Sequence, residues 1–326
     1  SGWLSRANEV VLSHPQREED RELKPSPLIS DIPVHAIDLP DYANYRDRIH
    51  RSRRIERVED CKAPVLDQAA ALHGGTAVIR DQAACPFRAL ARHRLGAAGV
   101  ETPHTGLNAM ERGTLVHRVL AQVWLQLKTK SALDALGAAD LDALLERAAE
   151  EAVARIRRDR PTTLSGRFAE IEKQRLHRLA HAWLNQEKKR GSFTVIATEE
   201  KRRVEIGGLA FGARLDRVDE LGDGRRIVID YKTSAPTAGA MLGERPDEPQ
   251  LPLYLVTAEP DAAAVAFAQV KAGDMRFAAL ARDGDILPGV KAFSESRYRD
   301  RHSSWDEAVA AWRTDLARIA ASFAGG

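Results

Sequence analysis

The 326-residue sequence has only two cysteines, Cys61 and Cys85, which excludes a disulfide framework. It has no apolar run of about 18 residues and no signal-peptide pattern, so we expect a soluble intracellular protein. Its 49 basic and 47 acidic residues leave a net charge of +2. So small a charge gives no global attraction to nucleic acid, and any such contact must use local basic patches.

The most informative segment is residues 211–234, FGARLDRVDELGDGRRIVIDYKTS, which is typical of a β-hairpin. Two apolar-rich runs flank a turn at Gly222-Asp223-Gly224, a strong hairpin signal. A hairpin symmetric about this turn places Asp216 opposite Asp230, where carboxylates with Cβ atoms roughly 5 Å apart repel each other. A divalent cation between them removes that repulsion, and oxygen ligands suit Mg²⁺ or Mn²⁺.

Alternation along the second strand places Lys232 on the same face as Asp230, with Tyr231 pointing away. Two carboxylates beside a lysine can hold a metal, polarise a phosphate and orient a water, which is the chemistry of phosphodiester hydrolysis. The Asp-x-Lys pattern alone occurs by chance in many proteins. The run Ile227-Val228-Ile229 strengthens the interpretation, because it predicts a buried strand whose end would bury an Asp and a Lys at a cost.

A Gly and a His four residues apart, Gly113 and His117, share one face of a helix predicted over residues 110–127. The glycine permits close approach, and the imidazole can reach a metal. Gln250 and Tyr254 share a face of a second helix, predicted over residues 249–257. Taken alone, His117 is an ordinary helix histidine, and the Gln–Tyr pair fits plain packing of a leucine-rich helix equally well.

Together these motifs resemble the RecB/AddB-type branch of the PD-(D/E)XK nucleases. Four elements in order carry the resemblance: GTLVH at 113–117, GARLDRVD at 212–219, VIDYKTS at 228–234 and QLPLY at 250–254. CPFRALARHRLGA at 85–97 is also similar to a segment of bacterial AddB-type repair proteins. The resemblance implies an α/β fold with a restriction-endonuclease-like core, in which a mixed central sheet is flanked by helices and interrupted by a helical insertion.

The resemblance also implies roles for the metal ligands, the lysine and the Gln–Tyr pair, and further site residues are expected from the sequence itself. The metal ligands are expected to be His117, Asp216, Asp230 and the backbone carbonyl of Tyr231. Lys232 is expected to orient or activate the attacking water. The rest of the site is expected to comprise Gln250 and Tyr254 in the catalytic set, Glu199 and Gly113 behind the ligands, and Arg214, Arg217, Arg53 and Arg54 in contact with DNA.

Mg²⁺ or Mn²⁺ is the expected cofactor, and no iron–sulfur cluster is expected. Many AddB-type nucleases hold such a cluster on four cysteines, three of which follow the position that matches Tyr254. Here no cysteine follows Cys85. The implied partners are DNA, single-stranded or with single-stranded ends, and a helicase or helicase-like subunit in a bacterial cytoplasm.

The chain is expected to divide near residue 75. Residues 1–74 are interpreted as a basic, partly extended linker and the tail of a preceding helicase-like region, and the opening Ser1-Gly2 suggests a piece of a longer protein. Residues 75–326 form the predicted nuclease domain. It begins with a short strand at 76–79 and continues with a helical subdomain (about 110–190), a catalytic core (about 193–281) and an amphipathic C-terminal helix (about 304–323). Core strands are predicted at 193–198, 201–206, 209–218, 227–232, 264–271 and 276–281.

A metal-dependent DNA nuclease of recombination or double-strand-break repair is the function that these features favour. Two alternatives stay open. One is a module with a nuclease fold that binds DNA or a helicase without cutting. The other is an unrelated metal-dependent hydrolase that acts on a small phosphoester.

Overall fold

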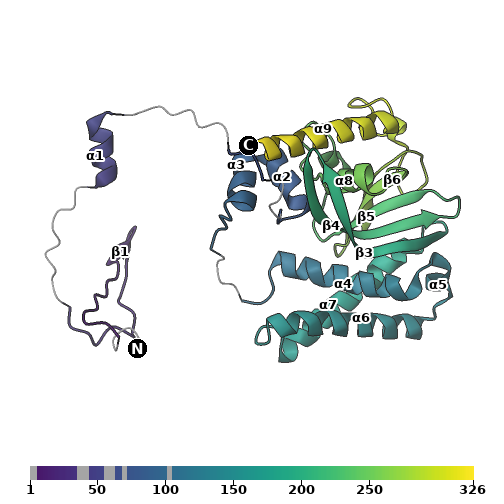
Figure 1. The fold of residues 1–326 in the computed structure, drawn as a ribbon. Coiled ribbons are helices and arrows are strands. Elements are labelled where there is room, and N and C mark those ends of the chain that lie inside the picture. Colours follow the sequence, from purple (N-terminus) through teal and green to yellow (C-terminus); the bar gives the residue numbers. More distant parts are fainter. Residues whose placement is uncertain (1–5, 35–43, 55–62, 68–71, 101–104) are drawn as a thin grey trace. The chain divides into compact units, whose positions relative to one another are not determined.

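The computed structural model describes residues 6–34, 44–54, 63–67, 72–100 and 105–326, and the chain divides into two units, Ser1–Asp60 and Cys61–Gly326 (Figure 1). In the described part of the first unit, strands β1 (Arg17–Glu18) and β2 (Arg21–Glu22) pair antiparallel. The same unit contains helix α1 (Tyr45–Ser52).

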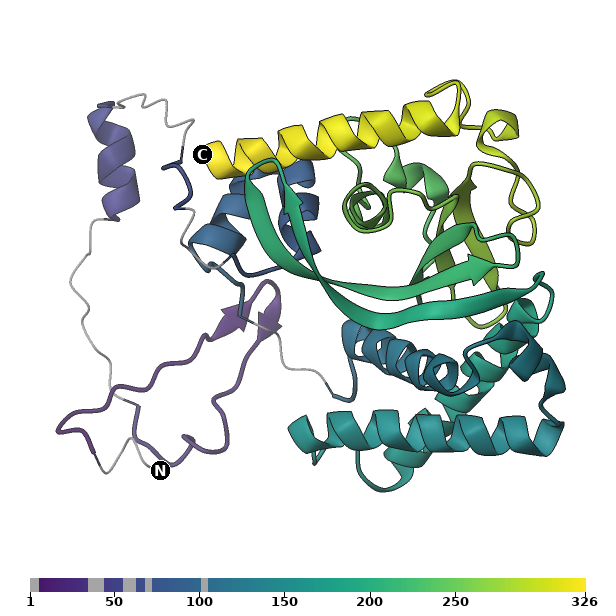
Figure 2. The same ribbon diagram turned by 45° about the vertical axis from the view of Figure 1, so that its right-hand side comes forward.

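The second unit is built on a mixed sheet, which has five strands among the described residues, in the order β3-β4-β5-β6-β7. Neighbouring strands pair antiparallel except β5 and β6, which pair parallel. Figure 2 shows the long, bent hairpin of β3 and β4 along one side of the sheet. The predicted mixed sheet is confirmed. The strands are β3 (Phe193–Ile206), β4 (Leu209–Leu221), β5 (Arg226–Lys232), β6 (Ala264–Gln269) and β7 (Arg276–Ala281).

Helices cover both faces of this sheet (Figures 1 and 2). On one face lie α4 (Ala109–Leu127) and α7 (Gly166–Glu187), with α6 (Ala138–Asp159) packed on both. The other face is covered by α2 (Thr76–Ala84), α8 (Gln250–Thr257) and α9 (Trp305–Gly325). Shorter elements are α3 (Pro86–Ala89), the π-helix η1 (Leu90–Arg94), α5 (Lys130–Ala135), η2 (Ala238–Met241) and η3 (Phe293–Glu295). Every helix in the described residues is too short or too polar to cross a membrane.

Helix α9 closes the second face with the apolar stripe that its sequence predicts. Ser304 caps it, because its hydroxyl accepts a hydrogen bond from the amide of Glu307 at 3.2 Å. Trp312 is 1% exposed, and its indole N–H donates to the carbonyl of Met241 at 2.7 Å. Trp305, Leu316 and Ile319 are buried in the same cluster, and Val309 is partly buried against it.

Two predicted elements are wrong. Residues 76–79 are not a strand but the first turn of α2, which starts after Gly75 and buries Val78 and Ile79 in the cluster that α9 covers. The separate strands predicted at 193–198 and 201–206 form one strand, β3, with a bulge at Ile196. The bulge exchanges the faces of the strand, since Val195 packs toward α4 and Ala197 toward α9.

Candidate active site

Asp216 and Asp230 lie where β4 and β5 stop pairing through their backbones. The ladder ends at Arg217 opposite Ile229, and one step further in the same register sets Asp216 opposite Asp230. Beyond the ladder, the backbone N–H of Tyr231 donates to Oδ2 of Asp216 at 2.9 Å. The side chain of Asp216 therefore replaces a backbone acceptor, and both carboxyl groups are buried in the register that the hairpin predicted.

Glu199 adds a third carboxylate to this row. Glu200 pairs with Leu215, which sets Glu199 opposite Asp216 on the neighbouring strand. The φ angle of Glu199 is 50°, a left-handed conformation that residues other than glycine seldom adopt and that is concentrated at functional sites. One ligand atom each from His117, Glu199 and Asp216 lies within 4.8 Å of the others. We had predicted that Glu199 lies behind the metal ligands. In the structure it lies among the candidate ligands themselves.

His117 reaches this row from α4. Its Nδ1 lies 3.1 Å from Oδ2 of Asp216, and its ring packs edge-on against Tyr231 at 5.8 Å between centroids. Burial alone lowers the pKa of His117, but the charge and hydrogen bond of Asp216 outweigh it and raise that pKa to about 9. At neutral pH without metal, a protonated imidazole therefore supplies the positive charge that the carboxylates favour.

A capping box of Asn108 and Glu111 starts α4 and places Gly113 and His117 in its second and third turns, facing the pocket. We expected the glycine to permit a close approach. A methyl group added at Gly113 would meet Oγ1 of Thr233 at 3.7 Å, which is an ordinary contact. The geometry of these described residues therefore does not require glycine there.

Asp230 is held by residues of two elements. Its Oδ1 accepts a hydrogen bond from Nε2 of Gln250 at 2.8 Å, and its Oδ2 lies 3.1 Å from Nζ of Lys232. The hydroxyl of Tyr254 donates to the carbonyl of Arg214 at 2.6 Å and lies 3.4 Å from Nε2 of Gln250. Gln250 thus supports the carboxylate of Asp230.

The carboxyl groups differ in acidity because their surroundings differ. Burial and then the charge of Asp216 raise the pKa of Asp230 to about 7. Burial alone would also raise the pKa of Asp216, but the charge and hydrogen bond of His117 lower it. Burial alone would lower the pKa of Lys232, but the charges of Asp230 and Glu248 raise it, and Oε2 of Glu248 lies 3.5 Å from Nζ. Lys232 is therefore an ammonium ion at neutral pH. No motif in the sequence singled out Glu248.

These side chains line one pocket of about 480 Å³. The pocket also contains the turn before α2 and the exposed Arg214, which pairs with Glu199 at 2.9 Å. The predicted site residues that it brings together are Gly113, His117, Glu199, Arg214, Asp216, Asp230, Tyr231, Lys232, Gln250 and Tyr254. Arg53 and Arg54 are exposed at the end of α1 in the other unit, so their contact with DNA stays a prediction.

The donor set fits a hard divalent cation. It offers carboxylates and an imidazole, and carboxylate oxygens suit Mg²⁺ and Mn²⁺. Oδ2 of Asp230 is buried beside Nζ of Lys232 but forms no well-aligned hydrogen bond among the described residues, so a lone pair is left for a cation. The pKa of Glu199 is raised by burial and by Asp216, which is the repulsion that a cation would remove.

A family model for the PD-(D/E)XK nuclease superfamily matches residues 77–326. The chain belongs to this superfamily. Its α/β fold is the expected one, and membership indicates a nuclease. Nucleases of the superfamily generally use divalent metal ions, in agreement with the group of His117, Glu199 and Asp216. A comparison with curated proteins finds no match.

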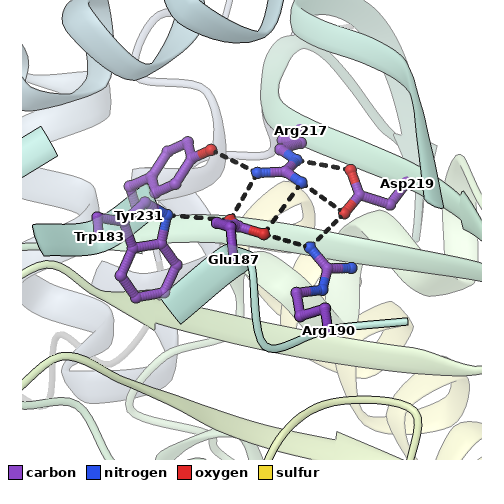
Figure 3. Close-up of polar contacts among 6 residues, drawn as sticks. All are labelled: Trp183, Glu187, Arg190, Arg217, Asp219 and Tyr231. Atoms are coloured by element: carbon purple, nitrogen blue, oxygen red, sulfur yellow. Dashed lines mark hydrogen bonds and ion pairs between the residues drawn. The ribbon is translucent and has the colours of Figure 1, made fainter. Parts of the chain in front are cut away.

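Arg217 corrects one predicted DNA contact. Its side chain is 0% exposed, because it lies on the face of β4 opposite to Asp216 and packs over the ring of Trp124 at 4.1 Å. Figure 3 shows its guanidinium between the carboxylates of Glu187 and Asp219. Nε donates to Oδ1 of Asp219 at 2.6 Å, and Nη1 donates to Oε1 of Glu187 at 2.8 Å. The prediction that Arg217 touches DNA is wrong.

The same buried network contains Arg190. Its Nη1 lies 2.7 Å from Glu187 and 2.8 Å from Asp219 (Figure 3). Nη1 of Arg217 also donates to the hydroxyl of Tyr231 at 3.1 Å. Tyr231 therefore links this network, which we call the rear ion network (Glu187, Arg190, Arg217 and Asp219), to the strand that carries Asp230.

Proposed function

We propose that this chain is a metal-dependent deoxyribonuclease that hydrolyses phosphodiester bonds with Mg²⁺ or Mn²⁺. One observation carries the proposal: three carboxylates in a row across adjacent strands meet an imidazole and a lysine in a single pocket. That combination has no evident structural use, since burying like charges together costs stability.

In this proposal His117, Glu199, Asp216, Asp230 and the carbonyl of Tyr231 hold the metal. When bound, the cation supplies Lewis acidity that acidifies water and offsets charge on the scissile phosphate. The imidazole must lose its proton to act as a ligand, so metal uptake releases a proton near neutral pH.

The lysine has the role of a fixed positive charge. Its ammonium group points into the pocket beside Asp230, and its raised pKa makes it a hydrogen-bond donor and a poor general base. Lys232 then positions the water and stabilises negative charge on the phosphate oxygens in the transition state. Gln250 fixes Asp230 through a 2.8 Å hydrogen bond, which leaves Oδ2 for the metal.

The finer assignment is a RecB/AddB-type nuclease of recombination or double-strand-break repair in the bacterial cytoplasm, working with a helicase or helicase-like partner. Four ordered motifs of that branch support it, from GTLVH at 113 to QLPLY at 250. We further propose that residues 75–326 form the nuclease domain and that residues 1–74 connect it to the partner region.

Cleavage assays on labelled DNA test the proposal. Linear and circular, single- and double-stranded DNA are incubated with the full chain and Mg²⁺, Mn²⁺ or EDTA. We expect cleavage with either metal, none in EDTA, and none with Lys232→Ala. The matched control is Lys271→Ala, because Lys271 is exposed in the β6–β7 turn and lies outside the pocket. Failure to cut any of these DNAs with either metal would exclude the proposed activity.

A further inference from the structure

A second pocket adjoins the catalytic one between α4 and α6. Its volume is about 470 Å³, and it shares Arg118, Glu199 and Arg214 with the catalytic pocket. A ligand that fills both pockets would pass directly from the row of carboxylates onto the surface of the helical insertion.

Arginines dominate the charge of this second pocket. Arg155 and Arg158, three apart on α6, join Arg118 and Arg214 around it, against the carboxylates of Glu151 and Glu199. Glu199 already pairs with Arg214. Among the described residues, Arg118, Arg155 and Arg158 have no acidic side-chain oxygen within ion-pair distance, and Nη1 of Arg118 is buried without a hydrogen-bond partner. A buried donor in this state calls for an acceptor from outside the chain.

The floor of the second pocket is apolar. Ala121 and Ala152 are buried there, while Leu125 on α4 is 54% exposed. An apolar floor with guanidinium groups at its rim matches a nucleotide, whose sugar and base need apolar contact while its phosphate accepts charged hydrogen bonds.

We propose that this second pocket binds one nucleotide of a single DNA strand next to the scissile phosphate, with Arg118, Arg155 and Arg158 on its phosphate. The inference rests on the proposed nuclease function and names its substrate as unpaired DNA. The volume is that of a site for one small molecule, and the apolar lining beside the guanidinium groups suits an unpaired base, whose faces are free to pack against it.

Binding measurements test the second pocket separately from catalysis. Fluorescence anisotropy of a labelled single-stranded oligonucleotide in EDTA compares the wild type with the double variant Arg155→Gln, Arg158→Gln. Both arginines are exposed and helical, and glutamine is a good helix former, so the fold should persist. The matched control is Arg313→Gln, an exposed arginine of α9 outside both pockets.

Each phosphate contact on single strands contributes about 0.7 to the slope of log Kd against log salt, so the double variant, which loses the contact to one phosphate, should lose about 0.7. At about 0.1 M salt this corresponds to a Kd raised about 5-fold. Arg155→Lys with Arg158→Lys should restore most of the slope, since lysine keeps the charge. The control should match the wild type.

Cleavage kinetics with Mn²⁺ complete the test. The double variant should raise KM with kcat within about twofold, as expected for loss of uniform binding. If the wild type cuts DNA and the double variant has the same Kd, salt slope and KM as the wild type, the proposal that the second pocket binds a nucleotide is wrong. It is also wrong if the double variant loses binding to blunt duplex DNA as strongly as binding to the single strand. If the wild type cuts nothing, the nuclease proposal fails, while the anisotropy still decides whether this pocket binds a strand.

Discussion

Replacing Arg217 with methionine should destabilise the nuclease domain strongly. Arg217 is fully buried and donates to Asp219 and Glu187 through Nε, Nη1 and Nη2. The rear ion network holds two carboxylates and two guanidinium groups, so the methionine leaves two buried negative charges facing only Arg190. Methionine fills much of the volume, and the loss is therefore mainly electrostatic.

The expected cost is about 3–5 kcal/mol, the range for breaking a buried ion pair by removing one partner. At about 2–4 °C per kcal/mol for a domain of this size, the melting temperature should fall by about 6–20 °C. The stability of the variant should be measured at pH 7. Burial alone would raise the pKa of Glu187, but Arg217 and Arg190 lower it below its ordinary 4.5. The contribution of this carboxylate to stability is thus fully present above that pH and is lost as the pH falls below it.

Urea and thermal unfolding followed by circular dichroism measure the effect. The matched control is Arg214→Met on the same strand, where the side chain is 58% exposed, and it should cost less than about 1 kcal/mol. Adding Asp219→Asn to Arg217→Met restores the charge balance, so the double variant should be more stable than the sum of the two single losses by about 1–3 kcal/mol. Additive losses, or an Arg217→Met protein that melts like the control, would refute the electrostatic account.

Four further outcomes are expected. Asp230→Asn should abolish cleavage. In EDTA the wild type should lose stability as the pH rises from 3.8 through about 7, because the pKa of this buried acid is raised in the folded state, and the Asn variant should not show that loss. Urea titrations at pH 5 and pH 8 check this difference. Lys232→Ala should lose cleavage but keep its affinity for Mn²⁺ in calorimetry, and loss of binding in a folded variant would give the lysine another role. Truncation before Ser304 should destabilise the whole domain, since α9 covers one face of its core, and an equally stable shortened protein would contradict this. The purified chain should contain no stoichiometric iron, and Cys85→Ser should keep activity; iron in elemental analysis would reverse that expectation.

The hairpin was the most predictable part of the site, because its geometry is local. A turn centred on Asp223 determines the partner of every residue in its strands, and the observed pairing of Arg217 with Ile229 is the predicted one. The same alternation places Asp230 and Lys232 on one face and Tyr231 on the other. Local rules therefore predicted which side chains of this hairpin meet.

Glu199 and the start of α2 were harder, because tertiary contacts decide them. Glu199 reaches the row of carboxylates only because β3 bulges at Ile196 and adopts φ 50° at Glu199 itself, and neither feature has a local sequence signal. The β-branched residues at 76–79 favoured a strand, but this segment is helical in the structure and packs Val78 and Ile79 in the cluster that α9 covers. Propensity was overridden by packing in that segment.

Arg217 shows why charge is a poor guide to exposure. The alternation that assigned Asp216 to the catalytic face also assigns Arg217 to the opposite face, so the position of Arg217 was predictable from the same rule. Its partner Glu187 comes from the end of α7, 30 residues earlier, and no pattern within the strand announces it. A charged residue on the buried face of a strand therefore predicts a distant partner of opposite charge. Here Glu187 holds Arg217, and Arg217 in turn donates a hydrogen bond to the hydroxyl of Tyr231, the residue between Asp230 and Lys232, where a precisely placed backbone matters most for the proposed chemistry.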